Sequence, residues 1–157
     1  MSKIYEVYPR MSYDDFESAW SDVPGWTCLS RNEDVNNELQ IKQAIFRKDE
    51  IGNDGVVEEF HVFYGNNRVI STSLWFKSED EKMLNRIFNY ALVRYNGLTN
   101  QHKKRKYYAY NNSLENFIFW RTFDDLNGEI FIAISLVNNN KGQSCVVINK
   151  TDEFGQD

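Results

Sequence analysis

The chain has 157 residues, of which 41% are hydrophobic and 26% are charged. These proportions are those of an ordinary globular protein and exclude a disordered chain, because enough apolar surface is present to offset the entropy of ordering. The net charge of −5 and the pI of about 5.1 are atypical of a dedicated nucleic-acid-binding protein.

Two helices are expected. The first spans 12–20, where Ser12 is placed to cap the N-terminus and where Phe16 and Trp20 share an apolar face. The second follows Ser78, and its apolar residues recur at three- and four-residue intervals. Acidic residues follow both cap positions, where the positive end of a helix dipole stabilises them.

Alternation of apolar and polar residues between turn signals predicts strands at 39–49, 57–65, 69–76, 105–110, 116–123, 129–137 and 144–150. The segment 26–38 is polar and is predicted to form turns. One alternative stays open, a helix over Val35–Phe46, because Leu39, Gln43 and Phe46 also align at helical spacing.

The resulting order, αβββ-αβββ(β), predicts an α+β fold: an antiparallel β-sheet with two helices packed on one face. We expect a single domain over 1–157, with a frayed tail at 151–157. Ser12 and Ser78 are 66 positions apart, and the central hairpins correspond loosely. Internal duplication into repeat halves 10–77 and 78–150 would explain this correspondence, and so would chance.

Residues that could act as soft metal ligands or as nucleophiles are few: His61, His102, Cys28 and Cys145. No two of them lie within a short motif, and the two cysteines are expected to be separate reduced thiols. Glu58 and Glu59 are expected at a solvated strand end, on opposite faces. No phosphate-binding glycine motif is present. We therefore predict no catalytic, cofactor-binding or metal-binding residue, no cofactor, and no enzymatic activity.

The start, MSKIYEVYPR, lacks the apolar run of a secretory signal. No segment has the roughly 20 apolar residues of a transmembrane helix. These observations predict a cytoplasmic protein that does not contact a membrane. They do not predict an oligomeric state.

The charge is unevenly distributed. Residues 1–77 contain 8 basic and 13 acidic residues, whereas 82–114 contains basic residues and no acid. That stretch includes four consecutive cations followed by tyrosines, in the sequence KKRKYYAY. The cations could neutralise phosphates while tyrosines stack on bases, or they could face the acids of the N-terminal half.

The aromatic content of 15% is high, and exposed tryptophan and tyrosine often anchor protein interfaces. The residues predicted to bind a partner are Lys103, Lys104, Arg105, Lys106, Tyr108, Trp75 and Trp120. The favoured hypothesis is a small non-enzymatic module of the inhibitor, immunity or adaptor type that occludes a partner protein. Acids of the N-terminal half would steer a basic target toward it. The alternatives are nucleic-acid binding through the basic run, and a small-ligand binder or enzyme that uses a concave sheet.

Overall fold

The computed structural model describes residues 7–20, 23–52, 55–98, 103–104, 114–124, 128–138 and 144–151. The two helices in this part of the chain are α1 (Tyr13–Trp20) and α2 (Glu81–Leu98). The strands that it contains are β1 (Trp26–Asn36), β2 (Ile41–Lys48), β3 (Val57–Gly65), β4 (Arg68–Ser78), β5 (Lys103–Lys104), β6 (Leu114–Asp124), β7 (Gly128–Asn138) and β8 (Ser144–Thr151).

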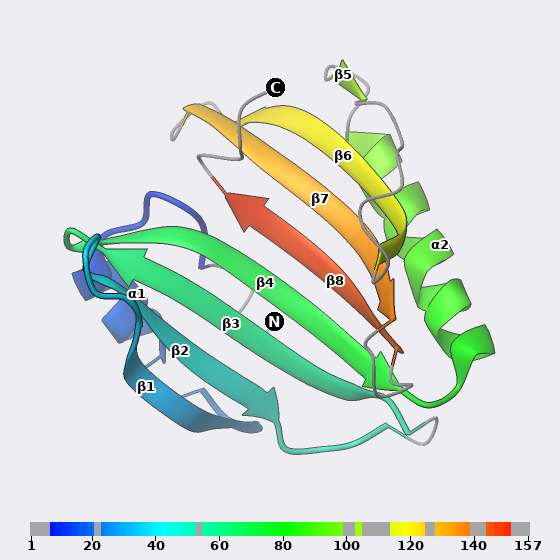
Figure 1. Ribbon diagram of the computed structural model, residues 1–157, viewed down its shortest axis with the longest axis horizontal. Helices are drawn as coiled ribbons and strands as arrows, with labels where there is room; N and C mark the ends of the chain where they lie inside the picture. The colour runs from blue at the N-terminus through cyan, green and yellow to red at the C-terminus, as the bar shows by residue number, and fades with distance from the viewer. Residues whose placement is uncertain are drawn as a thin grey trace.

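These strands form one antiparallel sheet in the order β1-β2-β3-β4-β8-β7-β6-β5, as Figure 1 shows. The chain therefore has the predicted α+β class. The first four strands make one half of the sheet and the last four make the other half. The two halves meet where β4 pairs with β8, so the last strand of each half lies at the centre.

The hairpin of β3 and β4 follows directly from its local sequence. Gly65 pairs with Arg68 across a two-residue turn formed by Asn66 and Asn67, whose φ angles are 52° and 61°. A type I′ turn requires positive φ at both central positions, and asparagine adopts this conformation more readily than most residues. The prediction of this hairpin is confirmed, as is the pairing of the strands predicted at 116–123 and 129–137.

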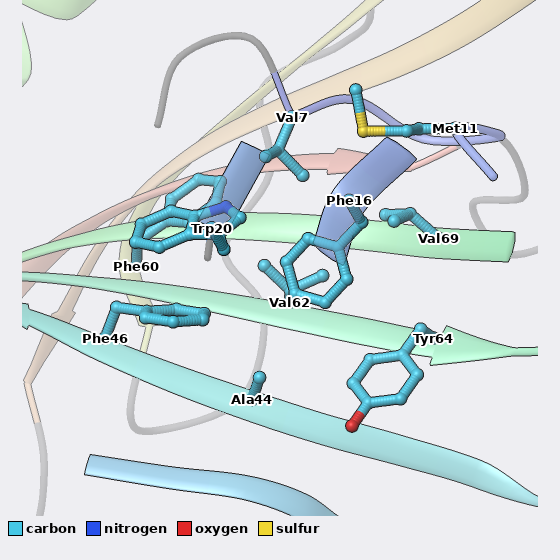
Figure 2. Packing of buried hydrophobic residues seen from close by; sticks show 10 residues of the cluster. All are labelled: Val7, Met11, Phe16, Trp20, Ala44, Phe46, Phe60, Val62, Tyr64 and Val69. Atoms are coloured by element: carbon cyan, nitrogen blue, oxygen red, sulfur yellow. The ribbon is translucent and has the colours of Figure 1, made fainter. Parts of the chain in front are cut away.

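Helix α1 begins where the sequence indicates, because the Ser12 Oγ accepts a hydrogen bond of 3.1 Å from the Asp15 backbone N–H. Its buried residues, Phe16 and Trp20, pack on the first half of the sheet. The Trp20 ring stacks on Phe46 with centroids 3.7 Å apart, and Figure 2 shows it above β2 and β3. Edge-to-face and stacked aromatic pairs therefore hold α1 in place.

Helix α2 starts later than Ser78, which corrects the predicted cap. The Asp80 Oδ1 accepts hydrogen bonds from the backbone N–H groups of Lys82 and Met83, at 3.0 and 3.3 Å. Asp80 is therefore the N-cap. Ser78 lies two residues before it, and its Oγ accepts a hydrogen bond from the Asp80 backbone N–H. Below the cap, Leu84 packs on β7 and β8.

Both helices lie on the same face of the sheet, as predicted. Leu74 on β4 packs against the core beneath α1 and also against the core beneath α2. A single strand can contact both cores through one residue only if they share a face, because successive side chains alternate between faces.

Strand β1 is the main correction to the predicted order. Residues 26–38 were expected to form turns, but Trp26–Asn36 pairs with β2 and makes the first half of the sheet four-stranded. The alternative helix over Val35–Phe46 is also wrong. β1 is an edge strand with three register irregularities and mostly exposed residues on both faces. It therefore has no buried face to produce an alternating apolar pattern.

At the C-terminus, Thr151 belongs to β8 and is 4% exposed, so the first residue of the predicted frayed tail is ordered in the sheet. The predicted strand at 105–110 and the rest of that tail lie outside the described residues. Among the described strands, the one at the far edge of the sheet is β5, which pairs Lys103 with Arg121.

Candidate binding surfaces

Among the predicted binding residues that the structure describes, Trp75 is separated from the others. Trp75 lies on β4, whereas Trp120 lies on β6 with β8 and β7 between them. Lys103 and Lys104 form β5, and Lys104 pairs with Trp120. Three further members of the predicted set lie outside the described residues: Arg105, Lys106 and Tyr108.

A polar network occupies the face of the sheet opposite α1 and α2, which we call the helix-free face because no helix of the described chain lies on it. Its centre is Glu59 on β3. The Glu59 Oε2 accepts hydrogen bonds from Arg47 Nη2 at 2.6 Å and Nε at 3.1 Å. The Oε1 accepts from Lys77 Nζ at 2.9 Å and from His61 Nε2 at 3.0 Å.

The strand register explains why these groups meet. Arg47 on β2 pairs with Glu59, and Glu59 pairs with Trp75 on β4, two residues before Lys77. The Glu59 side chain is only 4% exposed, contrary to the solvated position expected for it. Glu58 does lie on the opposite face, as predicted, where it pairs with Lys48 at 3.0 Å.

The network stabilises the ionised form of Glu59. Burial alone raises the pKa of its carboxyl, but hydrogen bonds from Arg47, Lys77 and His61 outweigh burial and lower the pKa to about 2. A carboxylate has about four lone-pair positions that can accept hydrogen bonds, and the four N–H donors from Arg47, Lys77 and His61 occupy all of them. Glu59 is thus a structural anion, with no lone pair left for a metal ion or a substrate.

His61 is fixed as a neutral imidazole. Its Nε2 contacts Glu59, and its Nδ1 lies 3.3 Å from Gln43 Nε2, so the Nε2–H donates to the carboxylate while Nδ1 accepts. Burial lowers the pKa of His61 and outweighs the hydrogen bond and charge of Glu59, which raise it; the nearby Lys77 lowers it further. Because both ring nitrogens have partners inside the network, neither is available as a general base.

Two members of this network lie against the Trp75 ring. The His61 ring stacks on it at a centroid distance of 5.0 Å, and the Lys77 Nζ lies 5.7 Å from its centroid. His61 pairs with Ser73, two residues before Trp75, whereas Lys77 follows two residues after it. Both groups also bind the Glu59 Oε1, so the indole, the imidazole and the ammonium group form one cluster.

A second surface lies at the edge of the sheet, on β1 and the turn that leads to β2. We call it the acidic edge and define it by six exposed residues: Leu29, Val35, Leu39, Glu33, Asp34 and Glu38. Its three aliphatic side chains are 46%, 51% and 63% exposed, in chain order. Apolar side chains and carboxylates are thus interspersed over the eleven residues 29–39 of one surface segment.

The acidic edge is held to the body of the protein by a clamp at its middle. The Arg31 guanidinium donates to Glu17 of α1 and lies over the Phe16 ring, 5.7 Å from its centroid. Burial raises the pKa of Glu17, but hydrogen bonds from Tyr13 and Arg31 outweigh this and lower it. β1 is therefore tied to α1 by an ion pair beneath its exposed side chains.

A second contact fixes the backbone of β1 at its bend. The Asn32 N–H donates to the Tyr64 hydroxyl at 3.0 Å, and that hydroxyl donates to the Asn32 side chain. Asn32 has a φ of 58°, a conformation that asparagine tolerates better than most residues. The exposed residues on either side are consequently presented on a fixed frame.

The sequence contained no periodic signal for the acidic edge, because an edge strand exposed on both faces need not alternate. Within the described residues, no group of three or more histidines, cysteines or acids could hold a metal ion. Neither of the described helices has the length and apolar character needed to cross a membrane.

No protein-family model matches the chain, and neither a curated protein nor a solved structure is significantly similar to it.

Proposed function

We propose that this protein is a small non-enzymatic binding module of the inhibitor, immunity or adaptor type, and that it docks a basic partner protein on the acidic edge. The observation that carries this proposal is the exposure of Leu29, Val35 and Leu39 beside three carboxylates on one segment. Large aliphatic groups that water can reach are available to be buried by a partner.

The energetic argument combines two contributions. Full burial of an exposed aliphatic side chain is worth about 1.5–3 kcal/mol, so the three together can supply much of the affinity of a modest complex. The carboxylates of Glu33, Asp34 and Glu38 would accelerate encounter with a positively charged surface and disfavour acidic proteins. This division matches the usual anatomy of an interface, with apolar anchors and a charged rim.

Strand β1 also offers main-chain groups to a partner. It pairs with β2 on one side, and no other described strand pairs with its outer side. An extended segment of the partner could add to this edge, which is a recurrent mode of peptide recognition. The register irregularities interrupt the ladder, so we expect short pairing supported by side-chain contacts.

The test reverses the charges of the edge. The variant E33K/D34K/E38K is expected to bind the partner, isolated with the native protein from lysate, about tenfold to hundredfold more weakly. The matched control is E50K/E79K/E81K, which makes the same charge change at exposed acids outside the acidic edge. Isothermal titration calorimetry measures both. A failure to recover any stoichiometric partner, or equal weakening by both variants, would contradict the proposal.

Nucleic-acid binding has less support among the described residues. Among the aromatic residues predicted to bind, Trp75 is the one whose surroundings are described, and the His61 ring stacks on it. A base that stacked on this side of the indole would have to displace His61.

We also infer that the two halves arose by duplication. Ser71 pairs with Thr151 and Ser78 pairs with Ser144. A two-fold rotation normal to the sheet at this junction therefore places β4 on β8 and the β3–β4 pair on the β7–β8 pair. In the part of the chain that the structure describes, four strands follow each helix, which supports the same relationship.

The cysteines support a cytoplasmic location for this module. Cys28 on β1 and Cys145 on β8 are both free thiols, as predicted, and three strands separate them. Free thiols are usual in a reducing compartment, whereas secreted proteins tend to pair them.

A further inference from the structure

The Glu59 network contains more positive than negative charge. Arg47 and Lys77 both bind the single Glu59 carboxylate, so the network holds two cations for one anion. The side chains of Arg47 and Lys77 are 48% and 44% exposed, whereas that of Glu59 is 4% exposed. The carboxylate thus lies at the base of the network, and the cations reach solvent above it.

Both cations retain hydrogen-bond donors. Arg47 uses its Nε and Nη2 on one oxygen of Glu59, which leaves the outer edge of the guanidinium, with Nη1, for another anion. Lys77 donates one of its three N–H groups to the other oxygen. Glu59 cannot accept these remaining N–H groups, because four donors already bind its two oxygens.

We propose that the helix-free face binds a phosphomonoester group between Arg47 and Lys77. The planar outer edge of a guanidinium matches two oxygens of a phosphate, and the ammonium group supplies a point charge to a third. A phosphomonoester carries close to two negative charges above pH 7, which suits two cations better than a single charge does.

The site is organised before the ligand arrives. Glu59 fixes both cations, and Lys77 additionally packs over the Trp75 ring at 5.7 Å. Binding therefore costs little side-chain entropy. The recognised group is the phosphate itself, because the groups that bind it are the two cations. This site is independent of the acidic edge and does not rest on the proposed protein-binding function.

The test is a titration of the full-length protein with methyl phosphate at pH 7.5 and constant ionic strength, followed by ¹H–¹⁵N NMR. Saturable shifts are expected at the Arg47 Nε–H and at the backbone amides of Glu59, Trp75 and Lys77. The variant K77Q is expected to bind about tenfold more weakly, the effect of losing one charge-assisted hydrogen bond. The charge-preserving K77R should remain within about threefold of the native affinity.

Lys48 provides the matched control. It is 43% exposed and lies on the same strand as Arg47, but it pairs with Glu58 on the opposite face. K48Q makes the same charge change and should leave the affinity within about twofold. Equal weakening by K48Q and K77Q would show diffuse electrostatic attraction and would overturn the proposal, as would shifts that do not saturate.

Two further titrations test whether the site prefers a phosphomonoester to other anions. Acetate tests for a carboxylate, and dimethyl phosphate tests for the singly charged diester found in a nucleic-acid backbone. Weaker binding of both than of methyl phosphate supports the proposal. Equal or tighter binding of either one would overturn the assignment to a phosphomonoester.

Discussion

Replacing Glu59 by glutamine is expected to lower the free energy of unfolding by about 3 kcal/mol at pH 7. The native carboxyl has a pKa of about 2 against an ordinary value of 4.5, and each pKa unit corresponds to about 1.4 kcal/mol. The amide cannot accept from Arg47 and Lys77 as an ion does, and its own N–H groups face theirs. Urea unfolding followed by circular dichroism measures the loss.

The same carboxyl gives the prediction a pH dependence. Its pKa is lower in the folded state than in the unfolded state, so its stabilising contribution is fully present above about pH 5. The contribution is lost as the pH falls from about 5 to about 2, because the unfolded state takes up the proton first. The difference in unfolding free energy between native protein and E59Q should therefore shrink across this interval.

The neighbouring residue supplies a control. Glu58 forms one ion pair with Lys48 at the opposite face, with side chains 20% and 43% exposed. E58Q should cost less than about 1 kcal/mol at pH 7, as is usual for a partly solvated pair. Similar losses for E58Q and E59Q, or a constant difference between native protein and E59Q down to pH 3, would contradict the role assigned to the network.

The second large effect is expected from replacing Phe16 by alanine. Phe16 is fully buried, and its ring lies 6.3 Å from that of Phe46 and 5.7 Å from that of Tyr64, centroid to centroid. Truncating a buried phenylalanine typically costs 3–5 kcal/mol, from lost transfer energy and the cavity left behind; we expect about 4 kcal/mol. Urea unfolding again provides the measurement.

Helix α1 depends on this residue because it has only 8 residues and cannot be stable alone. The control is D14A, an exposed position two residues away on the same helix, which should cost less than about 1 kcal/mol. We also expect F16A to reduce the near-ultraviolet circular dichroism that arises from Trp20 packed on Phe46. A loss below 1 kcal/mol for F16A would mean that α1 contributes little to the fold.

Elements with local signals could be predicted from the sequence. The paired asparagines that turn β3 into β4, the Ser12 cap and the apolar stripe of α2 each encode their structure within a few residues. The start of α2 was placed too early because Ser78 and Asp80 are both good cap residues, and only the backbone geometry shows which one accepts the helical N–H groups.

Strand β1 could not be predicted in this way. It is a strand because β2 offers it a hydrogen-bonding edge, and its own residues supply no alternating pattern. The acidic edge was not predicted for the same reason. Leu29, Val35 and Leu39 share one parity, but Arg31, Glu33 and Asn37 at the intervening odd positions interrupt the apolar alternation of a strand. The exposure of the three aliphatic side chains depends on the position of β1 at the end of the sheet.

The sequence by itself determined the two helices, the central hairpins, the α+β class and the uneven distribution of charge. The tertiary structure decided which of two adjacent carboxylates, Glu58 or Glu59, became the buried centre of a network. Because successive side chains of a strand point to opposite faces, Glu58 and Glu59 lie on opposite faces of the sheet. The partners of Glu59, however, come from β2 and β4. Pairing register brings those strands together, and register is a property of the whole sheet that no local stretch of sequence contains.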